Sequence, residues 1–192
     1  MASGVRRALI VLAVIAPVWF TARAANLEGV DVPDTQQVDG KTLQLNGYGM
    51  RNYALIVHVY VAALYLEHPG TDAAAILASP ETKLLSVTFL RNIDADSARK
   101  AWRDGLDNNC RSPCILNPDD LADFLAQVPA MRAGDNFSLV FTASGATVSV
   151  NGDHIGMVSH RPFAEAMLAT FLGPRPASPT LRQDLLAGGA KP

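Results

Sequence analysis

The order of apolar and polar residues along the chain predicts strands joined in hairpins and helices gathered in blocks. The longest apolar stretch, Ala54–Leu66, is rich in β-branched and aromatic residues, so it predicts a strand that is buried for much of its length. Shorter segments predict further strands at Thr82–Leu90, Phe137–Thr142, Thr147–Val150 and His154–Val158. Two pairs of turn residues, Asp39-Gly40 within Gln37–Leu45 and Asn151-Gly152 between the last two strands, are typical of hairpins.

Helices are indicated by capping residues followed by apolar residues at helical spacing. Thr71 or Asp72 is suited to cap a short helix that ends at Ala78, and Asp94 to open one that reaches about Asp107. The pair Asn117-Pro118 combines a cap with a proline at the first helical position. Two more helical segments are predicted, Pro162–Leu172, which Gly173-Pro174 ends, and Thr180–Leu186. This arrangement predicts an α+β fold, a mainly antiparallel sheet covered on one face by a layer of helices.

The first 24 residues have the pattern of a secretory signal peptide. Arg6 and Arg7 form a basic start, Ala8–Phe20 an apolar core, and Ala22-Arg23-Ala24 a small-residue cleavage site. The apolar core of 13 residues is shorter than the roughly 20 that span a membrane, and an uncleaved anchor is the alternative. We therefore expect cleavage after Ala24, one domain over residues 25–192, a periplasmic or secreted location, and no stable membrane span in the mature protein.

Net charge, chain length and the motifs of the sequence limit the classes of molecule that the protein is expected to bind. The formal charge is −2, and removal of the three signal-peptide arginines would change it to −5. A mature chain of 168 residues is large enough for one core, and its mild acidity without a basic stripe argues against nucleic acid. No Ser-His-Asp order, glycine-rich phosphate loop or metal-ligand spacing stands out, so we expect no cofactor and no metal.

The two cysteines, Cys110 and Cys114, lie four residues apart in NNCRSPC. In an oxidising compartment such a pair predicts a small-loop disulfide at the end of the preceding helix. Free thiols and a metal site are the alternatives, although a metal would need two further ligands and no histidine lies nearby in the sequence.

Arg51 stands just before the long apolar segment, and Tyr60 lies in its middle. A guanidinium at the edge of an apolar core needs solvent, a carboxylate of the chain or an anionic ligand, because an unpaired buried charge is costly. In one continuous strand the two side chains would point to opposite faces, whereas a bulge or turn near Arg51–Tyr53 would bring them to one face. The pattern leaves both arrangements open.

The segment Gly47–Glu67, GYGMRNYALIVHVYVAALYLE, resembles the chalcone isomerase-like family. Later parts of the chain follow the same order: the Asn-Gly hairpin near Val150, the helix PFAEAMLATFLG and the tail SPTLRQDLL. The likeness spans roughly Leu27 to Leu186 and suggests an exported bacterial member. It implies an open-faced β-sandwich that holds a ligand between the sheet and the helices.

The resemblance assigns roles to three residues. In chalcone isomerases the arginine matching Arg51 holds and activates a phenolate during ring closure, and the residue matching Tyr60, a threonine in the plant enzymes, acts through a bound water. A tyrosine there resembles the fatty-acid-binding members, in which arginine and tyrosine together grip a carboxylate. Thr170 matches a substrate-contacting threonine. The tyrosine and asparagine that complete the isomerase site have no counterpart in RNIDADSARKAW.

Three classes of function follow. The first is binding of a small apolar carboxylic acid, fatty or aromatic, or of a phenolic ligand, at Arg51, Tyr60 and Thr170. The second is an intramolecular lyase of the chalcone isomerase type, in which Arg51 stabilises an anion and Tyr60 positions a water or proton. The third is an envelope interaction domain, in which Arg51 pairs with an internal acid such as Asp94 or Glu67. Each of the three residues also has a purely structural alternative: a salt bridge for Arg51, a core position for Tyr60 and a packing role for Thr170.

Overall fold

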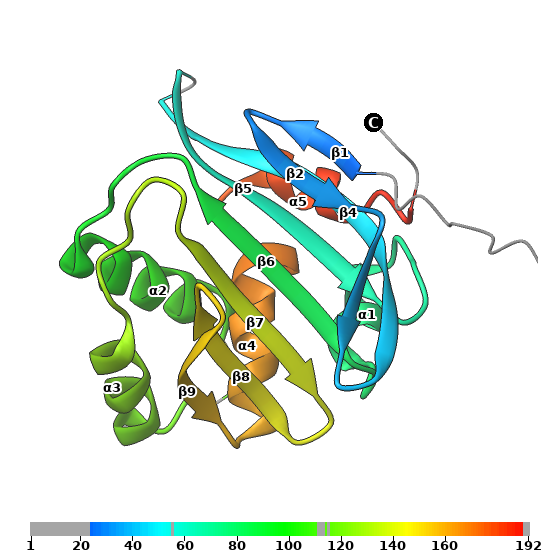
Figure 1. Cartoon of the computed structure of the whole chain (residues 1–192). Helices are drawn as coiled ribbons and strands as arrows, with labels where there is room; N and C mark the ends of the chain where they lie inside the picture. The colour runs from blue at the N-terminus through cyan, green and yellow to red at the C-terminus, as the bar shows by residue number, and fades with distance from the viewer. Residues whose placement is uncertain (1–23, 55, 111–113, 115, 190–192) are drawn as a thin grey trace, which may run out of the picture.

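The computed structural model describes residues 24–54, 56–110, 114 and 116–189, and its main element is a curled antiparallel sheet (Figure 1). Seven consecutive strands of this sheet lie side by side in chain order. They are β3 (Thr35–Val38), β4 (Lys41–Tyr53), β5 (Val57–Leu66), β6 (Lys83–Phe89), β7 (Asn136–Thr142), β8 (Gly145–Val150) and β9 (Asp153–Val158). A separate hairpin consists of β1 (Ala24–Leu27) and β2 (Val30–Pro33).

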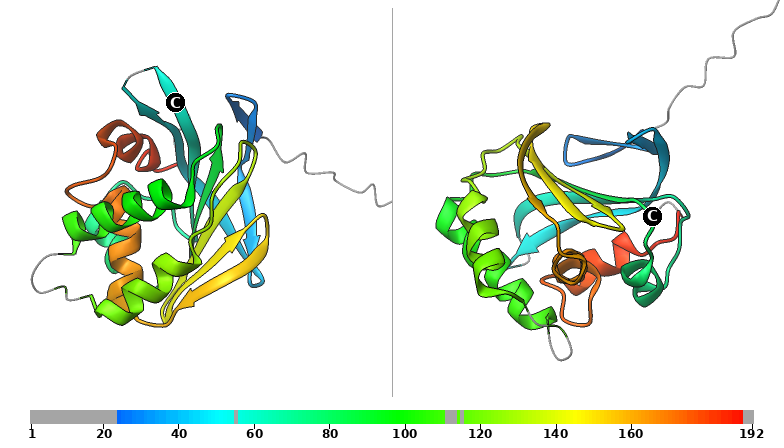
Figure 2. Two further views of the ribbon diagram at one scale, coloured as in Figure 1. Left: turned by 90° about the vertical axis from the view of Figure 1, so that its left-hand side faces the viewer. Right: turned by 90° about the horizontal axis from the view of Figure 1, so that it is seen from below.

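The two faces of the sheet are covered by different elements. Figure 2 shows the helices gathered on one face and the β1–β2 hairpin over the other. Alternate residues of β5 therefore enter two different cores, since successive strand residues point to opposite faces. Ala62, Leu64 and Leu66 pack with the helices, and Val61, Ala63 and Tyr65 pack with the hairpin. The expected α+β fold with a helical layer on one face is confirmed.

The helices begin close to where the capping residues predict. They are α1 (Ala73–Ala78), α2 (Ala95–Asn109), α3 (Pro118–Gln127), α4 (Arg161–Leu172) and α5 (Pro179–Leu185). The carboxylate of Asp72 accepts hydrogen bonds from the first-turn amides of α1, and Asp94 does the same for α2. Asn117 caps α3, with Pro118 at its first position. Side chains of all five helices join the core on the same face of the sheet.

The predicted strand Ala54–Leu66 is wrong at its start. β4 runs on to Tyr53, and β5 begins only at Val57. Between them Ala54 adopts a positive φ of 50°, and Ile56 donates its amide hydrogen to the Ala54 carbonyl, so the chain turns back. Ile56 is 83% exposed, which means that the apolar character of this segment does not mark burial here. The segment Ala54–Leu66 is thus a turn followed by the strand β5.

Two glycines and a buried asparagine fit β4 against α5. Asn46 is an unpaired residue at a bulge, because Leu45 pairs with Tyr65 while Gly47 pairs with Leu64. A Cβ atom at Gly47 would lie 2.1 Å from the Asp184 carbonyl oxygen, and one at Gly49 would lie 2.4 Å from the Asp184 carboxylate. The glycines therefore allow α5 to approach the backbone of the strand directly.

Candidate functional site

Arg51 and Tyr60 lie directly opposite each other on β4 and β5. Opposed residues of an antiparallel pair project from the same face of the sheet. Tyr60 packs into the helix-side core, so Arg51 projects from that face as well. A register shift follows at once, because Asn52 pairs with His58 and leaves Val59 unpaired. The hairpin turn, one of the two possibilities that the sequence leaves open, is what brings the two side chains together.

The guanidinium of Arg51 is half-buried and held by the backbone of a distant segment. Its Nη1 donates a hydrogen bond to the carbonyl oxygen of Ala177, in the linker between α4 and α5. Within the described part of the chain, no carboxylate lies within ion-pair distance of this guanidinium. Glu67 pairs instead with Lys41 at 2.7 Å, and Asp94 accepts from Ser97. The internal acids considered from the sequence therefore do not pair with Arg51.

The hydroxyl of Tyr60 stays protonated over the physiological pH range. Burial raises the pKa of Tyr60 to about 12, although the positive charge of Arg51 acts in the opposite direction. The ring contacts the edge of Phe89, its partner on β6, with ring centroids 5.7 Å apart. The site thus places a neutral O–H donor beside a permanent cation, and both groups can donate to the same anion.

Thr170 is a buried residue of α4 that lies beside α2. Its hydroxyl donates to the Met167 carbonyl of the same helix at 2.7 Å, and the residue is 6% exposed. Its methyl group lies against Gly105 of α2, where a Cβ would come within 3.0 Å. The Thr170 carbonyl accepts from the amide of Ala177 at 3.2 Å. Thr170 is therefore connected to Arg51 through the backbone of the linker, and its hydroxyl is engaged within α4.

Asp184 of α5 is a charged neighbour that sequence reasoning missed. Its carboxylate lies against Gly49, two residues before Arg51 on β4. Burial raises the pKa of Asp184 above its ordinary value. The pair of glycines in GYG is the signal that could have indicated a close approach of another backbone at this point.

Two cavities open elsewhere on the helical side. One of about 370 Å³ lies among α3, β8, β9 and the start of α4, where Phe124, Val148 and Phe163 form part of its wall. The other, of about 320 Å³, lies beside α1 at the end of β5. Arg51, Tyr60 and Thr170 line neither of these two cavities.

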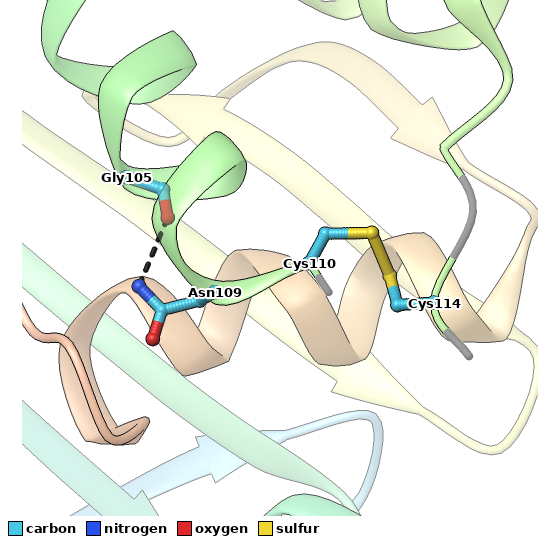
Figure 3. Close-up of a disulfide and its surroundings, with 4 residues drawn as sticks. All are labelled: Gly105, Asn109, Cys110 and Cys114. Carbon is cyan, nitrogen blue, oxygen red and sulfur yellow. Dashed lines mark hydrogen bonds between the residues drawn. A yellow bond between two sulfur atoms is a disulfide. The ribbon is translucent and has the colours of Figure 1, made fainter. Parts of the chain in front are cut away.

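Cys110 and Cys114 form the expected disulfide (Figure 3). Their Cα atoms are 5.1 Å apart, and Cys110 is the residue at which α2 ends. Beside it, Asn109 Nδ2 donates to the Gly105 carbonyl at 2.9 Å and to the Arg175 carbonyl at 2.9 Å. The end of α2 is thereby fixed both to the following loop and to the linker after α4.

In the described ranges, no group of three or more histidine, cysteine, aspartate and glutamate side chains is placed to hold a metal ion. In the same ranges, no helix is both long and apolar enough to cross a bilayer. The expected signal peptide lies outside the described residues, apart from Ala24.

Comparisons with known proteins agree with the fold. The chain is similar in structure to a fatty-acid binding protein of Arabidopsis thaliana, with a TM-score of 0.69 and 16% sequence identity, over 87% of this chain and 97% of that one. A search of curated proteins finds no match. The sequence pattern of the chalcone isomerase-like proteins matches residues 24–187, which is most of the chain. The chain therefore belongs to the chalcone isomerase-like family.

Proposed function

We propose that this protein binds a small apolar carboxylic acid, fatty or aromatic, whose carboxylate is held by Arg51 and Tyr60. The observation that supports this function best is the cross-strand pairing of the two residues on the helix-facing side of the sheet. A hydrogen bond to a charged partner contributes about 1.5–3 kcal/mol, so two such donors favour an anion over an uncharged ligand of the same shape. The similar Arabidopsis protein is itself a fatty-acid binding protein.

The Ala177 carbonyl occupies the position that the ligand's carboxylate would take. A carboxylate is a stronger acceptor for a guanidinium than a neutral carbonyl is, because both partners are charged. Binding therefore exchanges the hydrogen bond between Arg51 and the Ala177 carbonyl for one to the ligand. The apolar part of the acid would then contact Phe89 and the helix-side core beside Tyr60.

The proposal also places the protein outside the cytoplasm, in the periplasm or secreted. The disulfide between Cys110 and Cys114 is compatible with an oxidising compartment. The basic and apolar pattern of the first 24 residues provides the export signal. Sequencing the N-terminus of the protein recovered from its native cells tests this directly: a start at Ala25 is expected, and an intact Met1 would contradict cleavage.

Native mass spectrometry of the mature protein, followed by denaturing extraction, tests the binding function. We expect a co-purifying organic acid on the wild type and its loss in Arg51→Ala. Arg103→Ala is the matched control, since it removes an exposed arginine of α2 remote in sequence from the site. Acid retained equally by both variants would contradict the role of Arg51.

A further inference from the structure

Lys83 is a buried amine at the far end of the sheet from the acid site. It is the first residue of β6, is 5% exposed, and pairs with Leu66 and Phe141 on the helix-facing side. Tyr60 lies six residues before Leu66 on β5, a separation of roughly 20 Å along the strand. Figure 1 shows α1 beside this end of β5 and β6. Lys83 lines the cavity of about 320 Å³ that lies there, called the α1 cavity below.

The hydrogen bonds of Lys83 fit an uncharged amine. Its Nζ donates to the carbonyl oxygens of Ser79 at 2.6 Å and of Glu81 at 3.1 Å, the two acceptors that it meets among the described residues. An ammonium group has three N–H donors, whereas a neutral amine has two and a lone pair. Two acceptors satisfy the neutral form and leave one tetrahedral direction for the lone pair. Lys83, Ser79 and Glu81 all line the α1 cavity.

The surroundings of Lys83 favour this uncharged form. Burial lowers the pKa of its amine, and the positive charge of Arg161 at the start of α4 acts in the same direction. The carboxylates of Glu81, Glu165 and Glu67 oppose these two effects, with a smaller influence than burial. A lowered pKa increases the fraction of neutral, nucleophilic amine, so the position of Lys83 in a cavity has a chemical consequence.

The walls of the α1 cavity indicate the chemical class of its ligand. Leu66, Ala75 and Ile76 supply apolar surface. Asp72 and Glu81 also line the cavity, and two carboxylates disfavour an anionic ligand. The volume suits a small molecule. An uncharged molecule with an apolar chain and an electrophilic carbon satisfies all of these conditions.

The geometry points to Lys83 as a nucleophile that forms an imine with a small apolar aldehyde in the α1 cavity. The nitrogen lone pair attacks the carbonyl carbon, the C=O electron pair moves to oxygen, and a proton passes from nitrogen to that oxygen. The hydroxyl of this carbinolamine then leaves as water when the C=N bond forms. The leaving hydroxyl takes up a proton from solvent, and the remaining N–H proton of the nitrogen is released to solvent, so the protons balance. One amine and one aldehyde give one imine and one water, and no redox partner is required.

Reductive trapping tests the inference with controls inside the same protein. The sequence has four lysines, and two of the others, Lys41 and Lys100, have side chains 50% and 74% exposed. The folded protein is incubated with pentanal and sodium cyanoborohydride near neutral pH, digested, and mapped by mass spectrometry. We expect most of the adduct on Lys83 in spite of its burial, and a loss of that preference when the protein is unfolded in urea before labelling.

Lys83→Met is similar in length, carries no charge and removes the nucleophile, so it should lose most of the adduct while acid binding at Arg51 is unchanged. Adduct spread over Lys41 and Lys100 with little on Lys83 in the folded wild type would overturn the inference, whether or not the variant folds. Because the α1 cavity and the Arg51–Tyr60 pair are separate, failure of one proposal leaves the other testable by its own assay.

Discussion

Replacing Asn46 by alanine should destabilise the protein far more than the loss of a typical surface amide. Asn46 has no exposed surface. Its Nδ2 donates to the Leu185 carbonyl at the end of α5 at 2.7 Å, and its Oδ1 accepts from the Gly70 amide at 2.7 Å. One side chain thereby joins three segments, β4, α5 and the loop after β5. Alanine cannot make either bond, and the fully buried Leu185 loses its partner.

The size of the effect follows from these two contacts. Leaving a buried polar group without a partner costs about 1–3 kcal/mol. The Leu185 carbonyl and the Gly70 amide both lose their partner, but water can reach the partly exposed Gly70, so the total cost should be about 2–4 kcal/mol. In a domain of this size each kcal/mol lowers Tm by about 2–4 °C, which gives a decrease of roughly 5–15 °C. Urea unfolding of the mature protein, followed by far-UV circular dichroism, measures the free energy of unfolding directly.

Gln37→Ala is the matched control for Asn46→Ala. Gln37 makes a side-chain amide hydrogen bond of the same length, 2.7 Å to Thr42 Oγ1, but on an exposed strand. Its loss should change the free energy of unfolding by less than about 0.5 kcal/mol, because water replaces the partner. Equal effects of the two substitutions would refute the argument that the buried amide of Asn46 joins α5 to the sheet.

Three further substitutions test other parts of the fold. Gly49→Ala should destabilise the protein by about 1–3 kcal/mol, because the new Cβ would meet the Asp184 carboxylate at 2.4 Å. Gly70→Ala is the control and should be close to neutral, since a Cβ there meets nothing within 4 Å. Equal urea midpoints for the two variants would refute the argument. Burial raises the pKa of the Asp184 carboxyl, so the folded protein favours the protonated form. The stabilising contribution of this carboxyl is present below its unfolded-state pKa of 3.8 and is lost as the pH rises through the folded-state pKa. Asp184→Asn should therefore raise the urea midpoint at neutral pH and not at about pH 3, and an unchanged midpoint at neutral pH would contradict the shift. Cys110→Ser should lower the free energy of unfolding by about 2 kcal/mol, since the loop that closes at Cys114 is short, and reduction of the wild type with dithiothreitol should reproduce the change.

Local sequence signals predicted most elements of the fold because each of them depends on a few neighbouring residues. Asp72, Asp94 and the Asn117-Pro118 pair cap helices where expected. Asn151-Gly152 forms its hairpin turn with positive φ at both residues. The sequence allows a turn near Arg51–Tyr53 but does not place it at Ala54, because the residues there are apolar and hydrophobicity alone does not distinguish an exposed hairpin end from a buried strand. The β1–β2 hairpin was missed, although Glu28-Gly29 has the same positive-φ pattern at its turn.

The candidate site was only partly predictable. The family resemblance singled out Arg51 and Tyr60, but their common face depends on a turn and a register shift that strand periodicity does not encode. The Ala177 contact of Arg51 is made by a backbone carbonyl 126 positions away, so no residue type marks it. Lys83 begins an apolar strand and resembles a solvent-exposed strand end in the sequence. Its burial depends on α1 and α4, which pack over it from other parts of the chain.

The most direct test of the central proposal compares a carboxylic acid with its uncharged analogue. Isothermal titration of the mature wild-type protein with decanoate and with decanol separates the contribution of the carboxylate from that of the apolar chain. Two charge-assisted hydrogen bonds predict that the acid binds at least about tenfold more tightly, and that this preference disappears in Arg51→Ala and decreases in Tyr60→Phe. Equal affinity for the two ligands, or a preference that persists in Arg51→Ala, would contradict the carboxylate site.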